Sequence, residues 1–171
     1  EMLTGFFDDT ADKPWGELKK GILDLIVAVA VALTYLQYNG STIRFAGKEL
    51  VLHPVLFVIC AVVLVWASIN VTNCADGVDG LSGTLVIITL ATIYVIDNIR
   101  AAGSEFSFPI LLFIVCILGY LWYNATPSRL LMGDAGSRAM GVFISIAVLK
   151  SGSPFLYIPA AFVLIMDGGL G

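Results

Sequence analysis

Residues 70–81 read Asn70-Val71-Thr72-Asn73-Cys74-Ala75-Asp76-Gly77-Val78-Asp79-Gly80-Leu81 and lie between two strongly apolar segments. Two carboxamides and two carboxylates recur here at three-residue spacing, at positions 70, 73, 76 and 79. Residues three apart are neighbours on a helix surface, so a helical stretch would project all four polar groups together. Gly77 and Gly80 would let a ligand approach the backbone closely. A polar turn between two buried helices is the simpler alternative.

The composition around this stretch is typical of a membrane protein. The 171 residues are 58% hydrophobic and 13% charged, with a mean hydropathy of +0.94, whereas soluble domains are about 45–50% apolar and about 25% charged. Several apolar runs approach the roughly 20 residues that cross a bilayer. We therefore expect an all-α, polytopic transmembrane helical bundle that forms a single integral-membrane domain over residues 1–171. The net charge of −4 argues against nucleic-acid binding.

The apolar runs predict six spans, and the polar residues 1–20 precede them. The expected spans are residues 22–38, 54–69, 82–96, 109–124, a short fifth at 139–149 and a sixth that starts near residue 155. Residues 42–52 alternate apolar and polar side chains around a glycine, which predicts a short β-hairpin. The chain starts at Glu1 and stops inside an apolar segment, so we expect it to be part of a longer protein.

Counting the spans places the acidic residues on one membrane face, because each span switches side. Segment 1–20, loops 70–81 and 124–138 and the end of the sixth span share this face. The hairpin, loop 97–107 and turn 150–154 fall on the other. Ten acidic residues belong to the first face or its margin: Glu1, Asp8, Asp9, Asp12, Glu17, Asp24, Asp76, Asp79, Asp134 and Asp167. The five-to-four split of Lys and Arg favours a cytoplasmic acidic face and an extracytoplasmic hairpin.

Carboxylates gathered at membrane depth predict a cation site. Asp8, Asp9, Asp76, Asp79 and Asp134 cannot all stay ionised at close range unless they share a cation or their pKa values rise. Oxygen ligands without His or Cys partners favour Mg²⁺ or Mn²⁺ over zinc. Since proteins usually hold Mg²⁺ with one or two carboxylates and substrate phosphates, the pattern indicates a phosphate or diphosphate substrate.

Residues 133–137, Gly-Asp-Ala-Gly-Ser, precede an apolar helix and favour an anion there. Small residues expose the first backbone N–H groups, and the helix dipole attracts negative charge. Ser137 or Asp134 acting as a simple N-cap is the alternative. Five basic residues on this face could bind phosphate, although each could equally be a membrane-surface charge: Lys13, Lys19, Lys20, Arg129 and Arg138.

Three motifs in this order carry a family resemblance. Gly5-Phe-Phe-Asp-Asp9, Asn73-Cys-Ala-Asp-Gly-Val-Asp-Gly-Leu81 and Leu131-Met-Gly-Asp-Ala-Gly-Ser137 resemble the polyprenyl-phosphate N-acetylhexosamine-1-phosphate transferase superfamily. Within it, the phospho-N-acetylmuramoyl-pentapeptide transferases are the most similar. The resemblance covers essentially the whole chain. It implies that the chain is the middle and later portion of a ten-helix membrane protein of the bacterial inner membrane, with the active site at the cytoplasmic face.

The resemblance implies a reaction and its partners. Phospho-MurNAc-pentapeptide would be transferred from UDP-MurNAc-pentapeptide to undecaprenyl phosphate with Mg²⁺, forming lipid I for peptidoglycan and releasing UMP. The partners would be the two substrates and the lipid bilayer, with no nucleic acid, and a homodimer is left open. Asp8 would be the catalytic carboxylate, acting as a base on the lipid phosphate or as a nucleophile. Asp9 would support it, and Asp134 would ligate Mg²⁺.

Six positions would bind substrate by the same resemblance: Lys13, Asn73, Asp76, Asp79, Leu131 and Gly133. Asn73, Asp76 and Asp79 would shape the nucleotide site, with Asp79 near the uracil. Leu131 stands where the family often has a phenylalanine that stacks on the base. The family's lysine three residues after the acidic pair is Asp12 here, with Lys13 next, and its late His-rich motif lies beyond Gly171.

Three other functions remain open on sequence grounds. A UDP-GlcNAc:undecaprenyl-phosphate GlcNAc-1-phosphate transferase would share these motifs and differ in the late loop. An ion-coupled transporter would carry carboxylates at mid-span or on both faces, whereas these gather on one. A structural membrane subunit would leave the Asp8-Asp9 pair and the 133–137 motif without a role.

Overall fold

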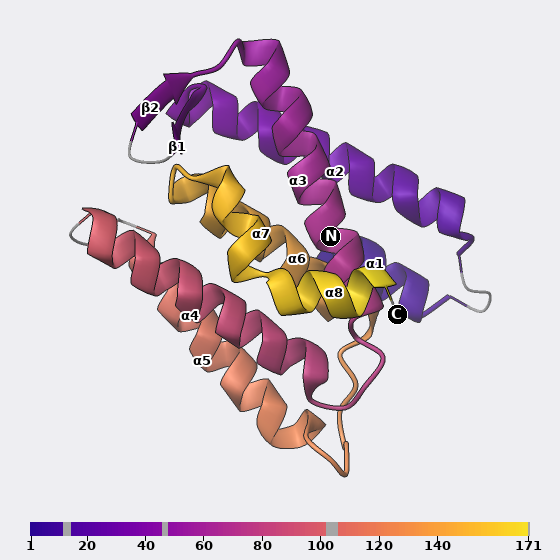
Figure 1. Ribbon diagram of the computed structural model, residues 1–171. Helices are drawn as coiled ribbons and strands as arrows, with labels where there is room; N and C mark the ends of the chain where they lie inside the picture. Colours follow the sequence, from indigo (N-terminus) through magenta and orange to yellow (C-terminus); the bar gives the residue numbers. More distant parts are fainter. Residues whose placement is uncertain (12–14, 46–47, 102–105, 171) are drawn as a thin grey trace.

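Four helices among the described residues are long and apolar enough to cross a membrane. The computed structural model describes residues 1–11, 15–45, 48–101 and 106–170, which are mostly helical (Figure 1). The four are α2 (Glu17–Asn39), α3 (Pro54–Cys74), α4 (Leu81–Ala101, of which Leu81–Ile99 qualifies) and α5 (Ser107–Asn124). They confirm the predicted spans at 22–38, 54–69, 82–96 and 109–124 and the membrane-bundle class.

The predicted fifth span is α6 (Gly133–Lys150), and it is longer and more polar than expected. Asp134, Arg138 and Lys150 are charged, and α6 is absent from the spans identified by length and composition among the described residues. Helix α6 nonetheless lies between the others and contacts α1, α3 and α4. The predicted start at residue 139 was therefore too late, because the polar 133–137 motif forms the first helical turn.

The predicted sixth span is broken into three pieces: η1 (Pro154–Leu156), α7 (Tyr157–Ala160) and α8 (Phe162–Leu170). Pro159 lies inside α7, where it has no backbone N–H to donate to the Phe155 carbonyl oxygen, and the break before α8 falls at Ala161. At the other end of the chain, α1 (Met2–Asp9) is helical, although the sequence predicted only a polar segment there. It rests against the beginning of α6.

The predicted hairpin is confirmed as antiparallel strands β1 (Thr42–Phe45) and β2 (Lys48–Val51), paired from Thr42↔Val51 to Phe45↔Lys48. The expected turn includes residues 46–47, which lie outside the described residues. Ile43 is buried against the ends of the helices, and the Arg44 amide donates to the Gly152 carbonyl oxygen at 2.6 Å. The hairpin is thereby joined to turn 150–154, as the side count predicted.

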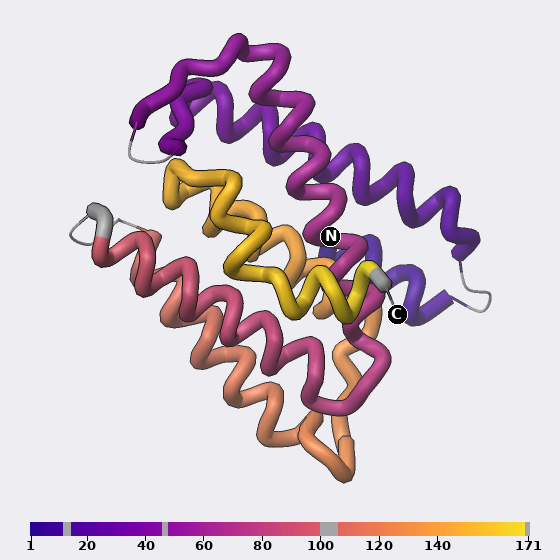
Figure 2. Tube along the Cα trace, in the orientation of Figure 1, coloured from indigo at the N-terminus to yellow at the C-terminus, as the bar shows by residue number. Residues whose placement is uncertain are grey.

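Two apolar cores meet at α6. One includes Leu90, Ile93, Ile110, Ile144 and Leu164, from α4, α5, α6 and α8. The other joins α2, α3 and the hairpin to the end of α6. The chain trace shows α4 and α5 as an antiparallel pair on one side and α2 with α3 on the other (Figure 2).

Close contact between α3 and α6 depends on Gly141. A Cβ added there would lie 2.6 Å from both Ile69 Cα and the Ser68 carbonyl oxygen. The Ser68 hydroxyl also donates to the Gly141 carbonyl oxygen at 2.8 Å. Small residues at helix crossings let backbones approach in this way in membrane proteins. The position of α6, and of everything on it, follows from this crossing.

We expect Gly141→Ala to lower the free energy of unfolding by about 1–3 kcal/mol, because the added methyl group overlaps the α3 backbone. Thermal unfolding in detergent measures the loss. Gly119→Ala on α5 is the matched control, since a Cβ there meets nothing within 4 Å. Equal unfolding temperatures for the two variants would contradict the close crossing.

Candidate active site

Three carboxylates from distant parts of the chain meet at one end of the bundle. Asp8 and Asp9 occupy the last turn of α1, and Asp134 lies in the first turn of α6. One oxygen atom from each lies within 4.8 Å of the others. We call this group the acidic triad. It unites the two residues predicted to be catalytic with the residue predicted to bind metal.

The α1–α6 contact brings the triad together. Gly5 packs directly on the backbone of Asp134 and Ala135, where a Cβ would overlap it. The Asp9 carboxylate accepts hydrogen bonds from the Asp134 and Ala135 amides, each at 3.3 Å. The sequence predicted an anion at this helix N-terminus, and the structure places the Asp9 side chain there. Gly133 has φ +66°, and a Cβ on it would lie 2.5 Å from Asp9 Oδ2.

Asp8 is buried and held in its ionised form. Burial alone would raise its pKa, but contacts with Lys20 and Trp15 outweigh burial and hold the pKa below its ordinary value. The Lys20 ammonium lies 2.6 Å from Asp8 Oδ2, and the Trp15 amide donates to Oδ1 at 2.6 Å. Asp8 is therefore a carboxylate at neutral pH.

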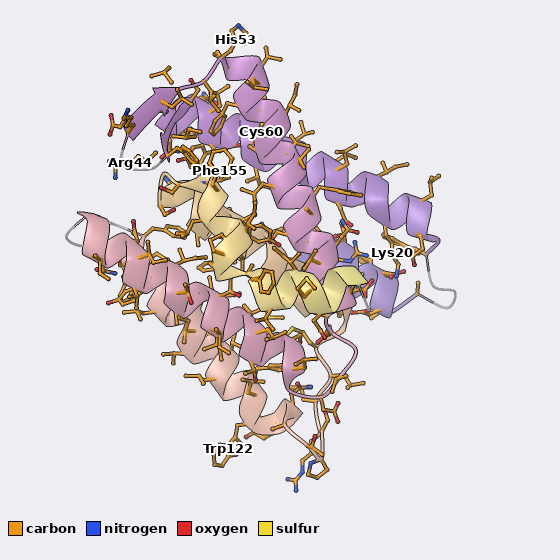
Figure 3. All side chains as sticks on the ribbon, viewed as in Figure 1. Lys20, Arg44, His53, Cys60, Trp122 and Phe155 are labelled. Atoms are coloured by element: carbon orange, nitrogen blue, oxygen red, sulfur yellow. The ribbon has the colours of Figure 1, made fainter. Side chains whose placement is uncertain are left out.

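Lys20 connects two members of the triad, and the sequence did not single it out from the other basic residues. Its ammonium also lies 3.0 Å from Asp134 Oδ2. Figure 3 shows Lys20 near the start of α2, at the opposite end of the molecule from Arg44 and His53. The neighbouring Lys19 instead lies over the Trp15 ring, 3.4 Å from its centroid. Only the helix register distinguishes these two lysines.

Asp24 and Arg138 form a buried ion pair beside the triad; Asp24 was not predicted as a site residue, and Arg138 was predicted only as one of five possible phosphate binders. Arg138 Nη1 donates to Asp24 Oδ1, and Nη2 lies 3.4 Å from Asp134 Oδ2. A charged residue inside an apolar span is costly unless paired, so Asp24 was a usable sequence signal. Its partner could not be named, since Arg138 lies 114 residues away.

A polar pocket of about 220 Å³ opens next to Asp134. Its lining residues are Asn73, Asp76, Gly77, Val78, Asp79, Asn124, Leu131, Met132, Gly133 and Asp134. It thus contains every predicted substrate-binding residue except Lys13, which lies outside the described residues. Residue 70 is not in the lining: α3 ends at Cys74, so the four polar groups of the 70–81 stretch do not share one helical face.

The pocket residues are fixed by hydrogen bonds. The Ser137 hydroxyl donates to Asn73 Oδ1 at 2.7 Å, joining α6 to α3. Asp76 accepts from the Ser82 hydroxyl. Burial raises the pKa of Asp76, the Ser82 hydrogen bond lowers it, and the negative charge of Asp134 raises it further, so that the net shift is upward. Asp79 and Leu131 are exposed and free to meet a ligand.

Asn124 links the two loops that border the pocket. Its Oδ1 accepts from the Gly80 amide at 2.7 Å, and its Nδ2 donates to the Leu130 carbonyl oxygen at 2.8 Å. Asn124 was not predicted as a site residue. A carboxamide closing an otherwise apolar helix was the available signal, but its partners lie in loops whose placement the sequence does not reveal.

Comparisons with known proteins show the family of the chain. The family model described as "Glycosyl transferase family 4" matches residues 1–152. The chain belongs to glycosyl transferase family 4. The family match covers both halves of the acidic triad and every residue that lines the polar pocket.

Relatives of this family 4 chain include three proteins named phospho-N-acetylmuramoyl-pentapeptide-transferase. The protein from Treponema pallidum strain Nichols is 40% identical over 99% of this chain and 52% of its own length. The Dictyoglomus turgidum protein is 30% identical over 84% of the chain and 47% of its own length. The Porphyromonas gingivalis protein is 34% identical over 75% and 34%. The chain spans about half the length of the Treponema and Dictyoglomus relatives.

We expect Asn124→Leu to loosen both loops around the pocket, because it leaves the Gly80 amide without its side-chain acceptor and leaves the Leu130 carbonyl oxygen only the Ser128 hydroxyl at 3.3 Å. A hydrogen bond of this kind contributes about 0.5–1.5 kcal/mol. Hydrogen–deuterium exchange should become faster in residues 75–80 and 125–132. Asn98→Leu is the control: Asn98 donates to Tyr94 and Ser107 at the other membrane face, so its loss should leave these two segments unchanged. Unchanged exchange in Asn124→Leu would disprove the link.

Proposed function

We propose that the protein containing this chain transfers phospho-MurNAc-pentapeptide from UDP-MurNAc-pentapeptide to undecaprenyl phosphate, forming lipid I and UMP. The convergence of Asp8, Asp9 and Asp134 beside a polar pocket is the observation that carries the proposal. A triad alone is compatible with many phosphoryl-transfer enzymes. The names of the relatives favour this substrate pair among them.

The acidic triad fits Mg²⁺. Its donors are all carboxylate oxygens, which suit this hard cation, and neither His nor Cys belongs to the group. Two of the carboxylates, Asp8 and Asp134, already share the Lys20 ammonium, so the site favours positive charge. We propose that Asp134 holds the ion with help from the Asp8-Asp9 pair. When bound, Mg²⁺ would neutralise charge on the diphosphate of the sugar nucleotide.

Asp8 is suited to act on the acceptor lipid. Asp8 is ionised at neutral pH, as a base or a nucleophile must be, although its lowered pKa makes it a weak base. Lys20 and the Trp15 amide occupy both of its oxygens and fix its direction. The base role and the nucleophile role both need a lone pair on one of these two oxygens, so the geometry is compatible with either. Asp9 anchors the start of α6 and so keeps Asp134 next to Asp8.

The polar pocket would hold the nucleotide. Asn73 and Asp76 lie in its wall, each fixed by a serine hydroxyl, while Asp79 and Leu131 are exposed at its edge. Asp79 would accept from the uracil, and Leu131 would cover the base without stacking on it. Gly133 lines the same pocket, and Lys13 would contact a substrate phosphate. Asp134 belongs both to the pocket lining and to the acidic triad. The sugar diphosphate would then point from the pocket towards Asp134.

A bacterial inner membrane is the proposed location, with the acidic triad and the pocket at the cytoplasmic face. UDP-sugars are cytoplasmic molecules, and the lipid phosphate of the acceptor lies at the membrane surface. The triad is close to the beginning of α2 and the pocket is beside the end of α3, which places both near an end of the candidate spans. An ion-coupled transporter is disfavoured because these carboxylates gather at one end.

Replacing Asp134 should remove the activity. We expect Asp134→Asn in the full-length protein to slow UMP release by on the order of 100-fold or more, since it weakens both ion binding and charge stabilisation at the diphosphate. UMP release from UDP-MurNAc-pentapeptide with undecaprenyl phosphate and Mg²⁺ measures this. Asp167→Asn, an exposed aspartate on the same membrane face, should retain activity. Normal turnover by Asp134→Asn would refute the metal assignment.

The donor sugar can be tested in the same assay. We expect UMP release with UDP-MurNAc-pentapeptide and little with UDP-GlcNAc, because the proposed donor carries a lactyl-peptide that the second lacks. Phosphatidylglycerol in place of undecaprenyl phosphate controls for the acceptor. Turnover with UDP-GlcNAc alone would instead identify a GlcNAc-1-phosphate transferase.

A further inference from the structure

A chain of ion pairs runs from the acidic triad into the bundle. Lys20 joins Asp8 to Asp134, and Arg138 joins Asp134 to Asp24. The last pair is almost completely buried, with Asp24 1% and Arg138 5% exposed. Taking two charges out of water costs several kcal/mol for each ion, and a salt bridge often returns less than that. If this pair only linked α2 to α6, its desolvation would cost more free energy than the link returns in stability.

The contacts of Asp134 point to a second role. Its Oδ2 receives Lys20 at 3.0 Å and Arg138 at 3.4 Å. Within the described part of the chain, no hydrogen bond or ion pair reaches its Oδ1. One oxygen atom is therefore held by two cations, and the other is left available.

We propose that the Asp24–Arg138 pair positions Asp134, so that Oδ2 is anchored and Oδ1 is presented to a divalent cation. This inference rests on the metal site of the proposed function. Arg138 suits the task because its planar guanidinium can engage two carboxylates in fixed directions. Asp24 receives Nη1, which leaves Nη2 aimed at Asp134. Both are positioning residues, since neither would touch the cation.

The charges of the cluster agree with this role. Asp8, Asp9, Asp24 and Asp134 contribute four negative charges, and Lys20 and Arg138 contribute two positive charges. These six groups sum to a formal charge of −2, and the Glu1 carboxylate also lies close to Asp24 and Arg138. Removing Asp24 and Arg138 together leaves this charge unchanged. A change in cation affinity in such a double variant would therefore come from the orientation of Asp134 and not from the net charge.

The decisive experiment measures Mn²⁺ binding to the full-length protein by the electron paramagnetic resonance of free Mn²⁺, without any substrate. We expect Asp24→Leu/Arg138→Leu to bind Mn²⁺ about 10-fold more weakly, the lower end of what second-layer partners of a metal site contribute. Its unfolding temperature in metal-free buffer should stay close to that of the unchanged protein, because an apolar pair can replace a buried salt bridge. Unchanged Mn²⁺ affinity would overturn the proposal.

Arg138→Lys is the second variant, and it provides the test of positioning if the double variant does not fold. It keeps the positive charge beside Asp24 but lacks the second arm that reaches Asp134. We expect weaker Mn²⁺ binding here too, and an affinity equal to that of the unchanged protein would count against positioning. Arg44→Leu/Glu49→Leu is the matched control, since it removes an exposed ion pair at the opposite membrane face and should leave the affinity unchanged.

Two reference measurements separate this inference from the proposed function. If the unchanged protein binds no Mn²⁺, or binds it equally well after Asp134→Asn, the metal site fails and the positioning role fails with it. If binding depends on Asp134 but not on Asp24 and Arg138, only the positioning role fails.

Discussion

The position of α6 against α1 and α3 is the constraint on which this site depends. Gly141 lets α6 touch the α3 backbone, and Gly5 lets α1 touch the start of α6. Asp134 thereby comes next to Asp8 and Asp9, and Ser137 reaches Asn73. A larger side chain at either glycine would separate the helices. The apolar packing of a membrane bundle and the polar geometry of the site are thus set by the same contacts.

Electrostatics decides what the gathered carboxylates can do. Four aspartates close together in a largely apolar bundle would repel one another or take up protons. Lys20 and Arg138 relieve part of this repulsion, and the α6 amides satisfy Asp9. The remaining negative charge would attract a divalent cation, which would in turn offset the charge of a diphosphate. The polar pocket next to Asp134 adds carboxamide and carboxylate groups for a nucleotide.

Much of this arrangement was predictable from local patterns. Apolar runs of membrane-spanning length identified the four long helices, and alternation around a glycine identified the hairpin. Counting spans placed the hairpin beside turn 150–154, which the Arg44–Gly152 hydrogen bond confirms. The motifs also named the triad and five of the pocket residues. The errors fell where polar residues continue a helix, at α1 and the start of α6, and where the predicted sixth span breaks at Ala161.

By itself, the sequence determined the class of protein, the gathering of the carboxylates at one end of the spans and the residue types of the site, because hydropathy and motif spacing are local properties. Only the tertiary structure decided which charges pair. Lys20 and not Lys19 faces Asp8, Arg138 turns to Asp24, and Asn124 closes the pocket, since each choice depends on helix rotation and on how distant segments pack. The 70–81 stretch shows the difference: its spacing suggested one helical face, whereas the end of α3 at Cys74 sends Asp76 and Asp79 into a loop that lines the pocket beside α6.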